Sequence, residues 1–377
     1  MVEKDEPFTR GIPRDNWTDW ANQFNSMKYL MWREKIESIV EGNFQPPYMV
    51  DLDPSNICNY DKCIWCNSKV FRHRHPRMLS TEHLLNLADF FKEWGVKSSC
   101  VSGGGEPLTN PGFSPFIWRM KKNGLKTGII TNGSLLDHEK AVSIAKCSSW
   151  CGFSVDAGTE ESFAKVHGVA ENIFSLVIEN IKHLVDLKKR VNSNLEITYK
   201  FLLHPLNANE VITAVKLAKE IGCNTFHLRP VCIDNLYGQK QEQIAYTPNM
   251  IDKINQQLDE AKDYETDNFK FYGVRHKFNP DFTRKINFKR CLATPMMATF
   301  GADGNVHLCF DLRGKPDFVL CSHFPDPREI LDVWGSAKHK EMIEKINPEK
   351  CPRCTVGTLN EIIEKAFIED RMYKDFL

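Results

Sequence analysis

Residues 58–66 read CNYDKCIWC, and residues 102–107 read SGGGEP. The first stretch places three thiols, Cys58, Cys63 and Cys66, in one short loop. Structural zinc takes four protein ligands, and His73 and His75 follow at an unsuitable spacing, whereas iron–sulfur clusters are normally held by cysteine thiolates. The loop therefore favours a four-iron cluster with one iron open to a further ligand, and zinc remains the alternative.

The second stretch offers backbone amides and one carboxylate. Consecutive glycines let a ligand approach the backbone closely, and the amides together with Glu106 suit a polar ligand that carries an ammonium group. A glycine run alone is weak evidence, because turns often use glycine. The two stretches together are far more specific than either one alone.

Both stretches follow apolar runs that belong to a longer alternation. Short apolar runs alternate with amphipathic segments, which indicates βαβ units and a parallel sheet buried on both faces. Six such units suit an open, partial barrel, since a closed eight-stranded barrel needs about 250 residues. Ligands of such sheets bind beyond the carboxyl ends of the strands, where both stretches lie. The expected strands are 49–52, 98–101, 127–131, 150–155, 196–202 and 225–228, and the expected helices include 81–94, 116–123, 170–188 and 209–221.

In these motifs the sequence resembles the radical S-adenosylmethionine (radical SAM) superfamily, over about residues 48–231. The resemblance implies that Cys58, Cys63 and Cys66 bind a 4Fe–4S cluster whose open iron binds S-adenosylmethionine. It also implies reductive cleavage of that cofactor to a 5′-deoxyadenosyl radical, which abstracts hydrogen from the substrate. The reduction in turn implies an electron donor such as flavodoxin or ferredoxin. The family's usual loop has three residues between the first two cysteines, whereas this loop has four, which a bulge can absorb.

The resemblance also implies a set of cofactor contacts along the sheet. For Lys200 and Arg229 an ordinary strand-end charge is an equal alternative. No catalytic residue is assigned. The implied contacts are Trp65 beside the adenine, Gly104, Gly105 and Glu106 at the methionine end, and Ser154, Asp156, Lys200 and Arg229 near the ends of the later strands.

A second group of cysteines lies in the last quarter of the chain. Cys291 and Cys309 flank an Asp-Gly hairpin signal at residues 303–304, and Cys351 and Cys354 form a C-x2-C pair. By spacing alone, two such pairs fit structural zinc or an iron–sulfur cluster. They resemble the twitch form of the auxiliary domain of radical SAM enzymes, a shortened SPASM domain, which implies one auxiliary 4Fe–4S cluster on these four thiols. Cys321 is left over, as a bystander or as a substitute ligand.

These patterns predict an α/β chain in four parts. Residues 1–47 form an N-terminal extension with a helix over 20–40, and residues 48–235 form a partial (β/α)6 barrel of the radical SAM type. Residues 236–288 are a linker with a helix near 249–264. Residues 289–377 form a small α+β auxiliary-cluster domain that ends in a helix.

The composition argues against several classes of function. Lysine plus arginine and aspartate plus glutamate both number 49, so no global positive charge attracts nucleic acid or a membrane surface. We find no run of eighteen apolar residues and no secretory leader, so we expect a soluble, cytoplasmic protein. The number of cysteines, 13, is odd, and disulfides are rare in reducing compartments, so we expect no disulfides. The scattered thiols, at residues 100, 147, 151, 223 and 232, are expected to be buried structural groups.

The substrate is the least determined feature. Only 47 residues precede the first strand and they show no winged-helix pattern, which favours a small molecule over a peptide. The basic run at 69–77 suits an anionic or sugar-like substrate, although a solvated loop is the simpler interpretation. A fully ligated auxiliary cluster suits acceptance of an electron, which indicates a net two-electron oxidation; epimerisation or cross-linking are the other outcomes. The alternatives are a peptide-modifying radical SAM enzyme that matures ribosomal peptides (RiPPs) and, in another class, a zinc-stabilised binding protein.

Overall fold

The centre of the molecule is one ten-stranded sheet with the order β10-β9-β8-β1-β2-β3-β4-β5-β6-β7. The structure is a computed structural model that describes residues 31–66, 68–69, 77–231, 246–274, 286, 288–351 and 354–369. The strands are β1 (Met49–Leu52), β2 (Ser98–Val101), β3 (Lys126–Thr131), β4 (Trp150–Ser154), β5 (Glu196–Leu203), β6 (Thr225–Pro230), β7 (Lys270–Gly273), β8 (Met297–Phe300), β9 (Asn305–His307) and β10 (Val319–Ser322).

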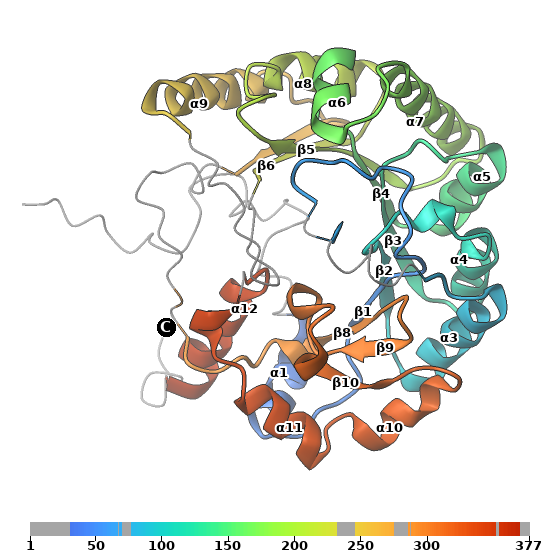
Figure 1. Cartoon of the computed structure of the whole chain (residues 1–377), viewed down its shortest axis with the longest axis vertical. Coiled ribbons are helices and arrows are strands. Elements are labelled where there is room, and N and C mark those ends of the chain that lie inside the picture. Colours follow the sequence, from blue (N-terminus) through green and yellow to red (C-terminus); the bar gives the residue numbers. More distant parts are fainter. Residues whose placement is uncertain are drawn as a thin grey trace, which may run out of the picture.

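The sheet is parallel from β8 through β1 to β7, and the pairs β8–β9 and β9–β10 are antiparallel. Its two edges, β7 and β10, do not pair with each other, so the barrel is open. Figure 1 shows the strands curving around the centre of the molecule with helices outside them. The prediction of an α/β fold with a partial barrel is confirmed.

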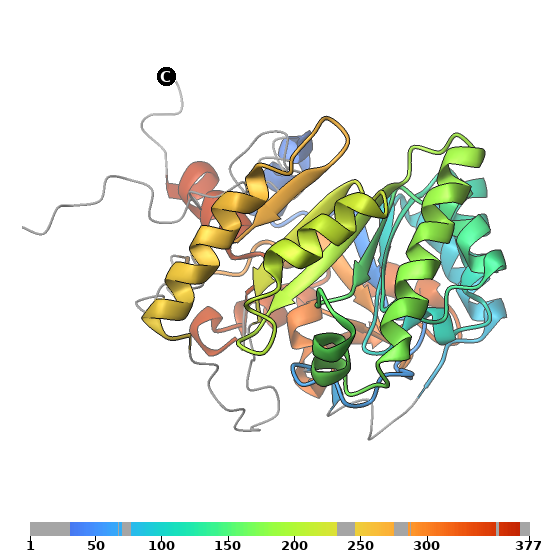
Figure 2. The same cartoon turned by 90° about the horizontal axis from the view of Figure 1, so that it is seen from above.

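Helices cover the outer side of this curved sheet, as Figure 2 shows from above. The helix α3 is a clear case of a helix set by its sequence, because the Ser80 hydroxyl caps its start and Gly95, at φ 93°, ends it. The helices are α1 (Arg33–Val40), α3 (Thr81–Trp94), α4 (Phe113–Lys122), α5 (His138–Cys147), α6 (Glu160–His167), α7 (Asn172–Arg190), α8 (Val211–Glu220), α9 (Pro248–Lys262), α10 (Ile330–Val333), α11 (Ala337–Glu344) and α12 (Gly357–Ile362).

The two faces of the sheet differ in polarity. The outward face is apolar and fully buried; Phe300 on β8, for example, packs edge-on against Phe91 of α3, with ring centroids 4.9 Å apart. On the concave face the register aligns Asp51 of β1 with Cys100 of β2, and Ser154 of β4 with Lys200 of β5. Cys100, Ser154 and Lys200 are only half-buried, so the concave face is polar and partly open to solvent.

Several elements depart from the sequence-based expectations. The helices α5 and α6 were not among the expected elements, and they have only ten and eight residues. A seventh strand, β7, continues the parallel sheet inside the segment expected to be a linker. The expected hairpin is confirmed, because β8 and β9 pair across residues 301–304. However, β8 also pairs in parallel with β1, so the C-terminal strands extend the main sheet.

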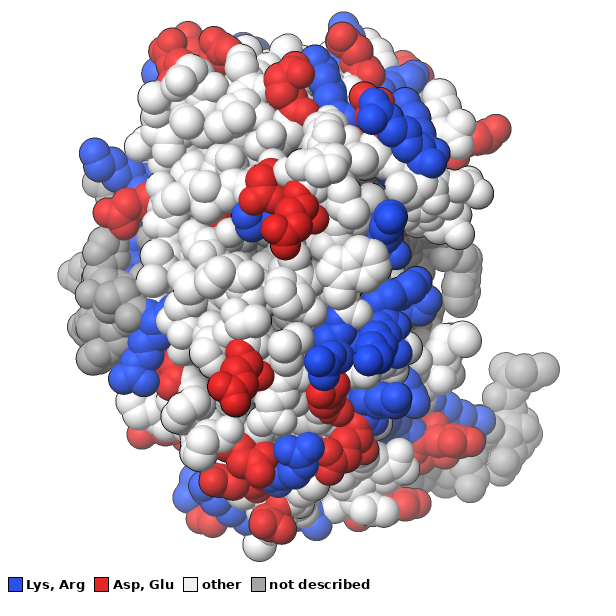
Figure 3. Space-filling view, turned by 90° about the vertical axis from the view of Figure 1, so that its right-hand side faces the viewer, with Lys and Arg blue, Asp and Glu red and all other residues white. Residues whose placement is uncertain are grey.

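The end regions agree with expectation where the structure describes them. The helix α1 covers the last part of the helix expected over 20–40, whose beginning lies outside the described residues. The expected tail helix is α12, which continues into one π-helical segment, Ile363–Glu369. Among the described residues, no helix is long and apolar enough to span a bilayer. Figure 3 shows lysine, arginine, aspartate and glutamate interspersed on the outer surface, with broad uncharged areas between them.

Candidate cofactor and cluster site

The structure brings the two motifs into direct contact. The backbone N–H of Gly105 donates to the carbonyl oxygen of Ser55 at 3.2 Å, and the N–H of Glu106 donates to that of Ile57 at 2.8 Å. The segment after β2 is thereby fixed beside the loop that begins at Cys58. All three loop thiols are half-buried, so they face a region that a ligand can reach.

The close approach of these segments explains why residue 105 is glycine. A Cβ atom at Gly105 would lie 2.2 Å from the carbonyl oxygen of Ile57 and 2.6 Å from the carbonyl carbon of Asn56. These are backbone atoms that cannot rotate away. Glycine is therefore required for the packing of one motif on the other, besides any contact with a ligand.

The longer cysteine loop is held at Asn59 by the segment after β3. The Asn59 side chain donates to the Ser134 hydroxyl at 2.8 Å and accepts from the Asn132 amide at 2.9 Å. The Asn132 oxygen in turn accepts from the backbone N–H and the hydroxyl of Ser134. Two side-chain hydrogen bonds thus anchor the longer loop.

The structure also places His167 beside the cysteine loop. The sequence did not indicate this position. Its Nδ1 lies 3.3 Å from Cys63 Sγ, and its Nε2–H donates to the Val155 carbonyl oxygen at 3.0 Å. Burial lowers the pKa of His167 to about 4, so the ring is neutral near pH 7. The Tyr60 ring lies 5.5 Å from the His167 ring. A single histidine at the end of a short helix carries no motif, so no sequence signal identified it.

Glu106 is buried and almost completely hydrogen-bonded. Its Oε1 accepts from Thr131 Oγ1 at 2.6 Å and from the Leu108 N–H at 3.0 Å, and its Oε2 accepts from the Asn132 N–H at 2.7 Å. Burial raises the pKa of this carboxyl to about 7, although these three donors oppose the rise. A carboxylate has about four acceptor positions, so Oε2 retains one for a donor such as an ammonium group.

The later predicted contacts lie on the concave face or at its rim. Ser154 and Lys200 are neighbours in register, and Arg229 is half-buried near the end of β6. Burial, together with the charge of Arg229, lowers the pKa of Lys200 to about 8. The half-buried Trp65 ring has its centroid 6.0 Å from that of His204.

Asp156 differs from these residues because its side chain is deeply buried in the protein's own structure. It adopts a left-handed backbone, with φ 60°, and its Oδ1 accepts from the Leu202 N–H at 2.7 Å. Its carbonyl oxygen accepts from the Asn207 amide at 2.7 Å. Burial raises the pKa of the Asp156 carboxyl to about 7. These contacts fix the turn between β4 and α6, and a contact with the cofactor stays a prediction.

The four C-terminal cysteines lie near one another. Burial raises the pKa of the Cys354 thiol to about 12, and the charges of Cys291 and Cys351 add to the rise. Burial also holds the pKa of Cys309 well above its usual range, with Cys291 and Cys354 contributing. Cys321 lies on β10 and packs against the main core, away from this group.

Two side chains hold the segments of this C-terminal cysteine group. The Asp311 carboxylate accepts from the Thr355 N–H at 2.8 Å and from its hydroxyl at 3.1 Å, which joins the segment of Cys309 to that of Cys354. The Asn360 oxygen accepts from the N–H groups of residues 292 and 293, and its amide donates to Cys291 Sγ at 3.7 Å.

Both cysteine groups have the donor chemistry of iron–sulfur sites. Within the described ranges, no group of three or more histidine, cysteine, aspartate or glutamate side chains is close enough to bind a single metal ion. Cysteine thiolates are the usual ligands of iron–sulfur clusters, and the two donor sets are the three half-buried thiols of the loop and the four thiols of the C-terminal group.

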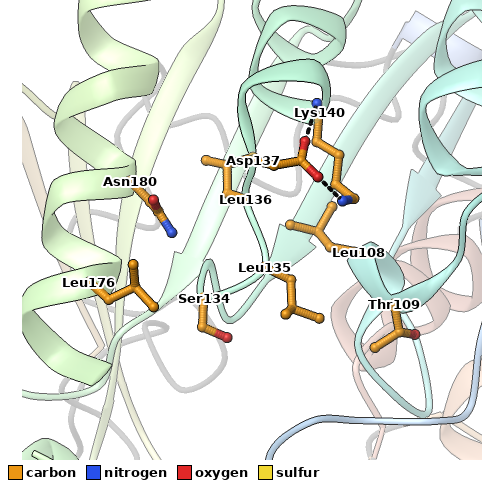
Figure 4. A pocket seen from close by; sticks show the side chains of 9 residues that line it. All are labelled: Leu108, Thr109, Ser134, Leu135, Leu136, Asp137, Lys140, Leu176 and Asn180. Atoms are coloured by element: carbon orange, nitrogen blue, oxygen red, sulfur yellow. Dashed lines mark hydrogen bonds and ion pairs between the residues drawn. The ribbon is translucent and has the colours of Figure 1, made fainter. Parts of the chain in front are cut away.

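A surface cavity of about 530 Å³ lies beside the cysteine loop, on the outer side of the carboxyl end of β3. In Figure 4 leucine side chains line it, with the Asp137–Lys140 ion pair at one side and Asn180 of α7 opposite. It contains none of the predicted site residues. Its lining residues are Leu108, Thr109, Ser134, Leu135, Leu136, Asp137, Lys140, Leu176 and Asn180.

Comparison with known proteins gives the family. Residues 52–218 match the family model described as the Radical SAM superfamily. The chain is similar to a "Probable GTP 3′,8-cyclase" of Saccharolobus islandicus (strain M.14.25 / Kamchatka #1), with 26% identity over 206 residues, 53% of this chain and 63% of that protein. It is also similar to an "S-adenosylmethionine-dependent nucleotide dehydratase" of Selenomonas ruminantium, with 27% identity over 171 residues, 45% of this chain and 61% of that protein. The matches thus span under two thirds of these relatives' lengths.

Solved structures share the fold. Streptococcus suis SuiB bound to S-adenosylmethionine superposes with a TM-score of 0.63 at 16% identity, over 87% of this chain and 76% of SuiB. The enzyme anSMEcpe with bound AdoMet and the Cp18Cys peptide superposes with a TM-score of 0.56 at 18% identity, over 84% of this chain and 88% of that one. The fold, the contact between the two motifs and the family match all indicate the same family. The region of residues 52–218 is therefore a radical SAM domain.

Proposed function

We propose that this radical SAM enzyme binds a 4Fe–4S cluster on Cys58, Cys63 and Cys66 and S-adenosylmethionine beside it. The observation that carries the proposal is the pair of backbone hydrogen bonds that fixes Gly105 and Glu106 against the start of the cysteine loop. When bound, the cluster and the cofactor supply reductive cleavage of S-adenosylmethionine and hydrogen abstraction from a substrate. The protein's part is to bind, orient and exclude water.

The predicted cofactor contacts other than Asp156 have positions that suit their roles. Glu106 retains an acceptor position for the methionine amino group, beside the backbone of Gly104 and Gly105. Lys200 and Arg229 offer cations to the methionine carboxylate, and the pKa of Lys200, about 8, leaves it mostly charged at pH 7. Ser154 supplies a hydroxyl at the end of β4, and Trp65 an aromatic face for the adenine.

We further propose one auxiliary 4Fe–4S cluster on Cys291, Cys309, Cys351 and Cys354, in a twitch-like arrangement. Support comes from the gathering of these thiols and from the two side chains, Asp311 and Asn360, that hold their segments. With such a cluster in place, the electron left after hydrogen abstraction has an acceptor, so the reaction is a net two-electron oxidation.

A small polar molecule is the substrate that we favour. The relatives named as a GTP 3′,8-cyclase and a nucleotide dehydratase support a substrate of nucleotide size. The second candidate is a peptide, because SuiB is known bound to a precursor peptide and anSMEcpe bound to the Cp18Cys peptide. The basic run considered for an anionic substrate lies mostly outside the described residues, at 70–76.

The external electron donor, a flavodoxin or ferredoxin, would approach the cysteine loop from outside. The exposed side chains of Ile57 and Ile64, next to Cys58 and Cys63 in the sequence, offer an apolar contact, and the exposed Lys62 offers a charge to an acidic partner. None of the described cysteines forms a disulfide, which suits a reducing compartment such as the cytoplasm.

Anaerobic reconstitution tests the proposal. The wild-type protein should bind about eight irons, cleave S-adenosylmethionine with dithionite and give a four-iron signal by electron paramagnetic resonance that changes when the cofactor is added. Cys66→Ala should abolish 5′-deoxyadenosine formation, and Cys321→Ala, the matched control, should retain it. A colourless protein with stoichiometric zinc would refute the proposal.

To test the auxiliary site separately, Cys351 and Cys354 are both replaced by alanine. This variant should lose about half the iron and keep some cofactor cleavage while product formation stops. Equal loss of cleavage in this variant and in Cys66→Ala would show that the second site is structural.

A further inference from the structure

The side chain of His167 is buried against the cysteine loop, although none of the predicted cofactor contacts includes it. His167 is the last residue of α6, and only 3% of its side chain is exposed. Its Nδ1 lies 3.3 Å from Cys63 Sγ, and its Nε2 lies 3.0 Å from the carbonyl oxygen of Val155. Both ring nitrogens are therefore engaged, one by a predicted cluster ligand and the other by the backbone that follows β4.

The packing around the ring holds it in this orientation. The centroid of the Phe163 ring lies 4.6 Å from that of His167, and the centroid of the Tyr60 ring lies 5.5 Å from it. The backbone also joins the loop to the helix, because the N–H of Ile64 donates to the carbonyl oxygen of Val166 at 3.0 Å. The imidazole and the middle of the cysteine loop are thus fixed relative to each other by contacts that do not depend on the thiol.

The partners of the two nitrogens determine where the hydrogens lie. A carbonyl oxygen only accepts, so Nε2 carries a hydrogen, and Nδ1 of the neutral ring has a lone pair. While Cys63 is a thiol, Nδ1 accepts its hydrogen. A cysteine that binds iron is a thiolate and has no hydrogen to donate. The contact of 3.3 Å stays attractive in that state because the hydrogen remains between the two atoms, now on Nδ1.

This transfer is balanced, because the hydrogen that leaves Sγ is the one that Nδ1 gains. The ring then carries a positive charge between two negative partners. One is the thiolate of Cys63, and the other is the carboxylate of Asp156, whose Oδ2 lies 3.8 Å from Nε2. Hydrogen bonds between ionised groups are stronger than those between neutral groups, so the contact with Cys63 becomes stronger when iron is bound.

We propose that His167 is a positioning residue of the cluster site, which donates an N–H···S hydrogen bond to Cys63 and thereby raises the reduction potential of the cluster bound there. The inference rests on the proposed function, because it takes Cys63 to be a cluster ligand. Hydrogen bonds to the sulfurs, net charge and solvent exposure set the potential of an iron–sulfur cluster. A higher potential makes the cluster easier for a flavodoxin or ferredoxin to reduce.

The midpoint potential of the loop cluster tests this role. It is measured by electron paramagnetic resonance at a series of controlled potentials, in the double variant Cys351→Ala, Cys354→Ala, which is the single-cluster parent. Added to this parent, His167→Leu removes the donor. The one-electron equilibrium should then shift about tenfold toward the oxidised cluster, which lowers the midpoint potential by about 59 mV.

Two further variants separate the hydrogen bond from a loss of packing. His167→Asn also loses the contact with Val155, but it keeps an N–H donor at the position that corresponds to Nδ1, so its potential should fall less than that of His167→Leu. His323→Leu replaces another buried histidine, which packs against Phe300, and should leave the potential unchanged.

A spectroscopic measurement detects the hydrogen bond without any use of activity. The parent is produced with 15N-labelled histidine, and pulsed electron paramagnetic resonance of the reduced cluster reports the labelled nitrogens that couple to it. We expect a 15N coupling in the parent and in His323→Leu, and its loss in His167→Asn and His167→Leu. If His167→Leu does not retain its cluster, the coupling in the parent and its loss in His167→Asn still decide the question.

The outcomes separate the inference from the proposed function. An unchanged potential in His167→Leu, or an equal fall in His167→Leu and His167→Asn, would overturn the hydrogen bond as the cause, and so would a labelled parent without a 15N coupling. A parent that shows no four-iron signal would instead refute the proposed function, on which the inference rests.

Discussion

Replacing Gly105 by alanine should separate the two motifs. The new Cβ would lie 2.2 Å from the Ile57 carbonyl oxygen, so the backbone must move to relieve the contact. That movement breaks the hydrogen bonds of 3.2 and 2.8 Å that join residues 105 and 106 to the loop. Each bond contributes about 1 kcal/mol and overpacking costs about 1–3 kcal/mol, so the free energy of unfolding should fall by roughly 3–5 kcal/mol.

Urea unfolding of the metal-free protein measures this loss, and iron content after reconstitution measures its effect on the cluster loop. Gly95→Ala is the matched control, because Gly95 has φ 93° but no atom within 4 Å of its Cβ position. It should cost only the backbone strain, about 1–2 kcal/mol, and keep full iron content. A Gly105→Ala protein with wild-type stability and iron content would refute the argument.

Three further perturbations test other parts of the structure. Phe300→Ala should cost about 3–5 kcal/mol in urea unfolding, because it empties a buried ring site next to Phe91; a loss below about 1 kcal/mol would contradict this packing. Burial lowers the pKa of His323 and of His339 to about 4, so at these two sites the unfolded chain binds more protons between about pH 4 and 6.5, and the stability that they contribute falls as the pH falls through this window. His339→Gln removes one of the two sites, so the variant should lose less stability than the wild type over the same pH range, and an unaltered slope would contradict this. Asp311→Ala should lower iron content toward four per chain, because the Cys309 and Cys354 segments lose their shared partner, and full iron content would show that Asp311 is dispensable.

The sequence predicted the parts of the fold that local patterns determine. The first six strands follow short runs that contain apolar residues and alternate with amphipathic segments, and α3 has a serine cap and a terminal glycine, so their positions needed no knowledge of distant contacts. The strand β7 lies in a polar segment, and it is a strand because β6 offers a parallel edge to it. The pairing of β8 with β1 likewise depends on residues far apart in the chain.

The residues of the candidate site likewise divide into those that a local pattern identifies and those that depend on distant contacts. The cysteine spacing and the glycine run are local patterns, so the loop thiols and Gly105 can be identified from the sequence alone. His167 and Asn59 hold that loop through partners 104 and 73 residues away, and Arg313 reaches Asp53 across 260 residues. No short motif encodes such contacts. Their identification needed the register of the sheet and the course of the C-terminal segment.

The parallel pairing of β1 with β8 has a consequence for how the chain is made. During synthesis, β1 leaves the ribosome early, yet its second neighbour is translated roughly 250 residues later, and closing so long a loop is entropically slow. Until then one edge of β1 stays unpaired, and unpaired edges are where nascent chains aggregate. Shortened forms that end before β8 should therefore depend on chaperones, even though all the residues of the family match are present in them.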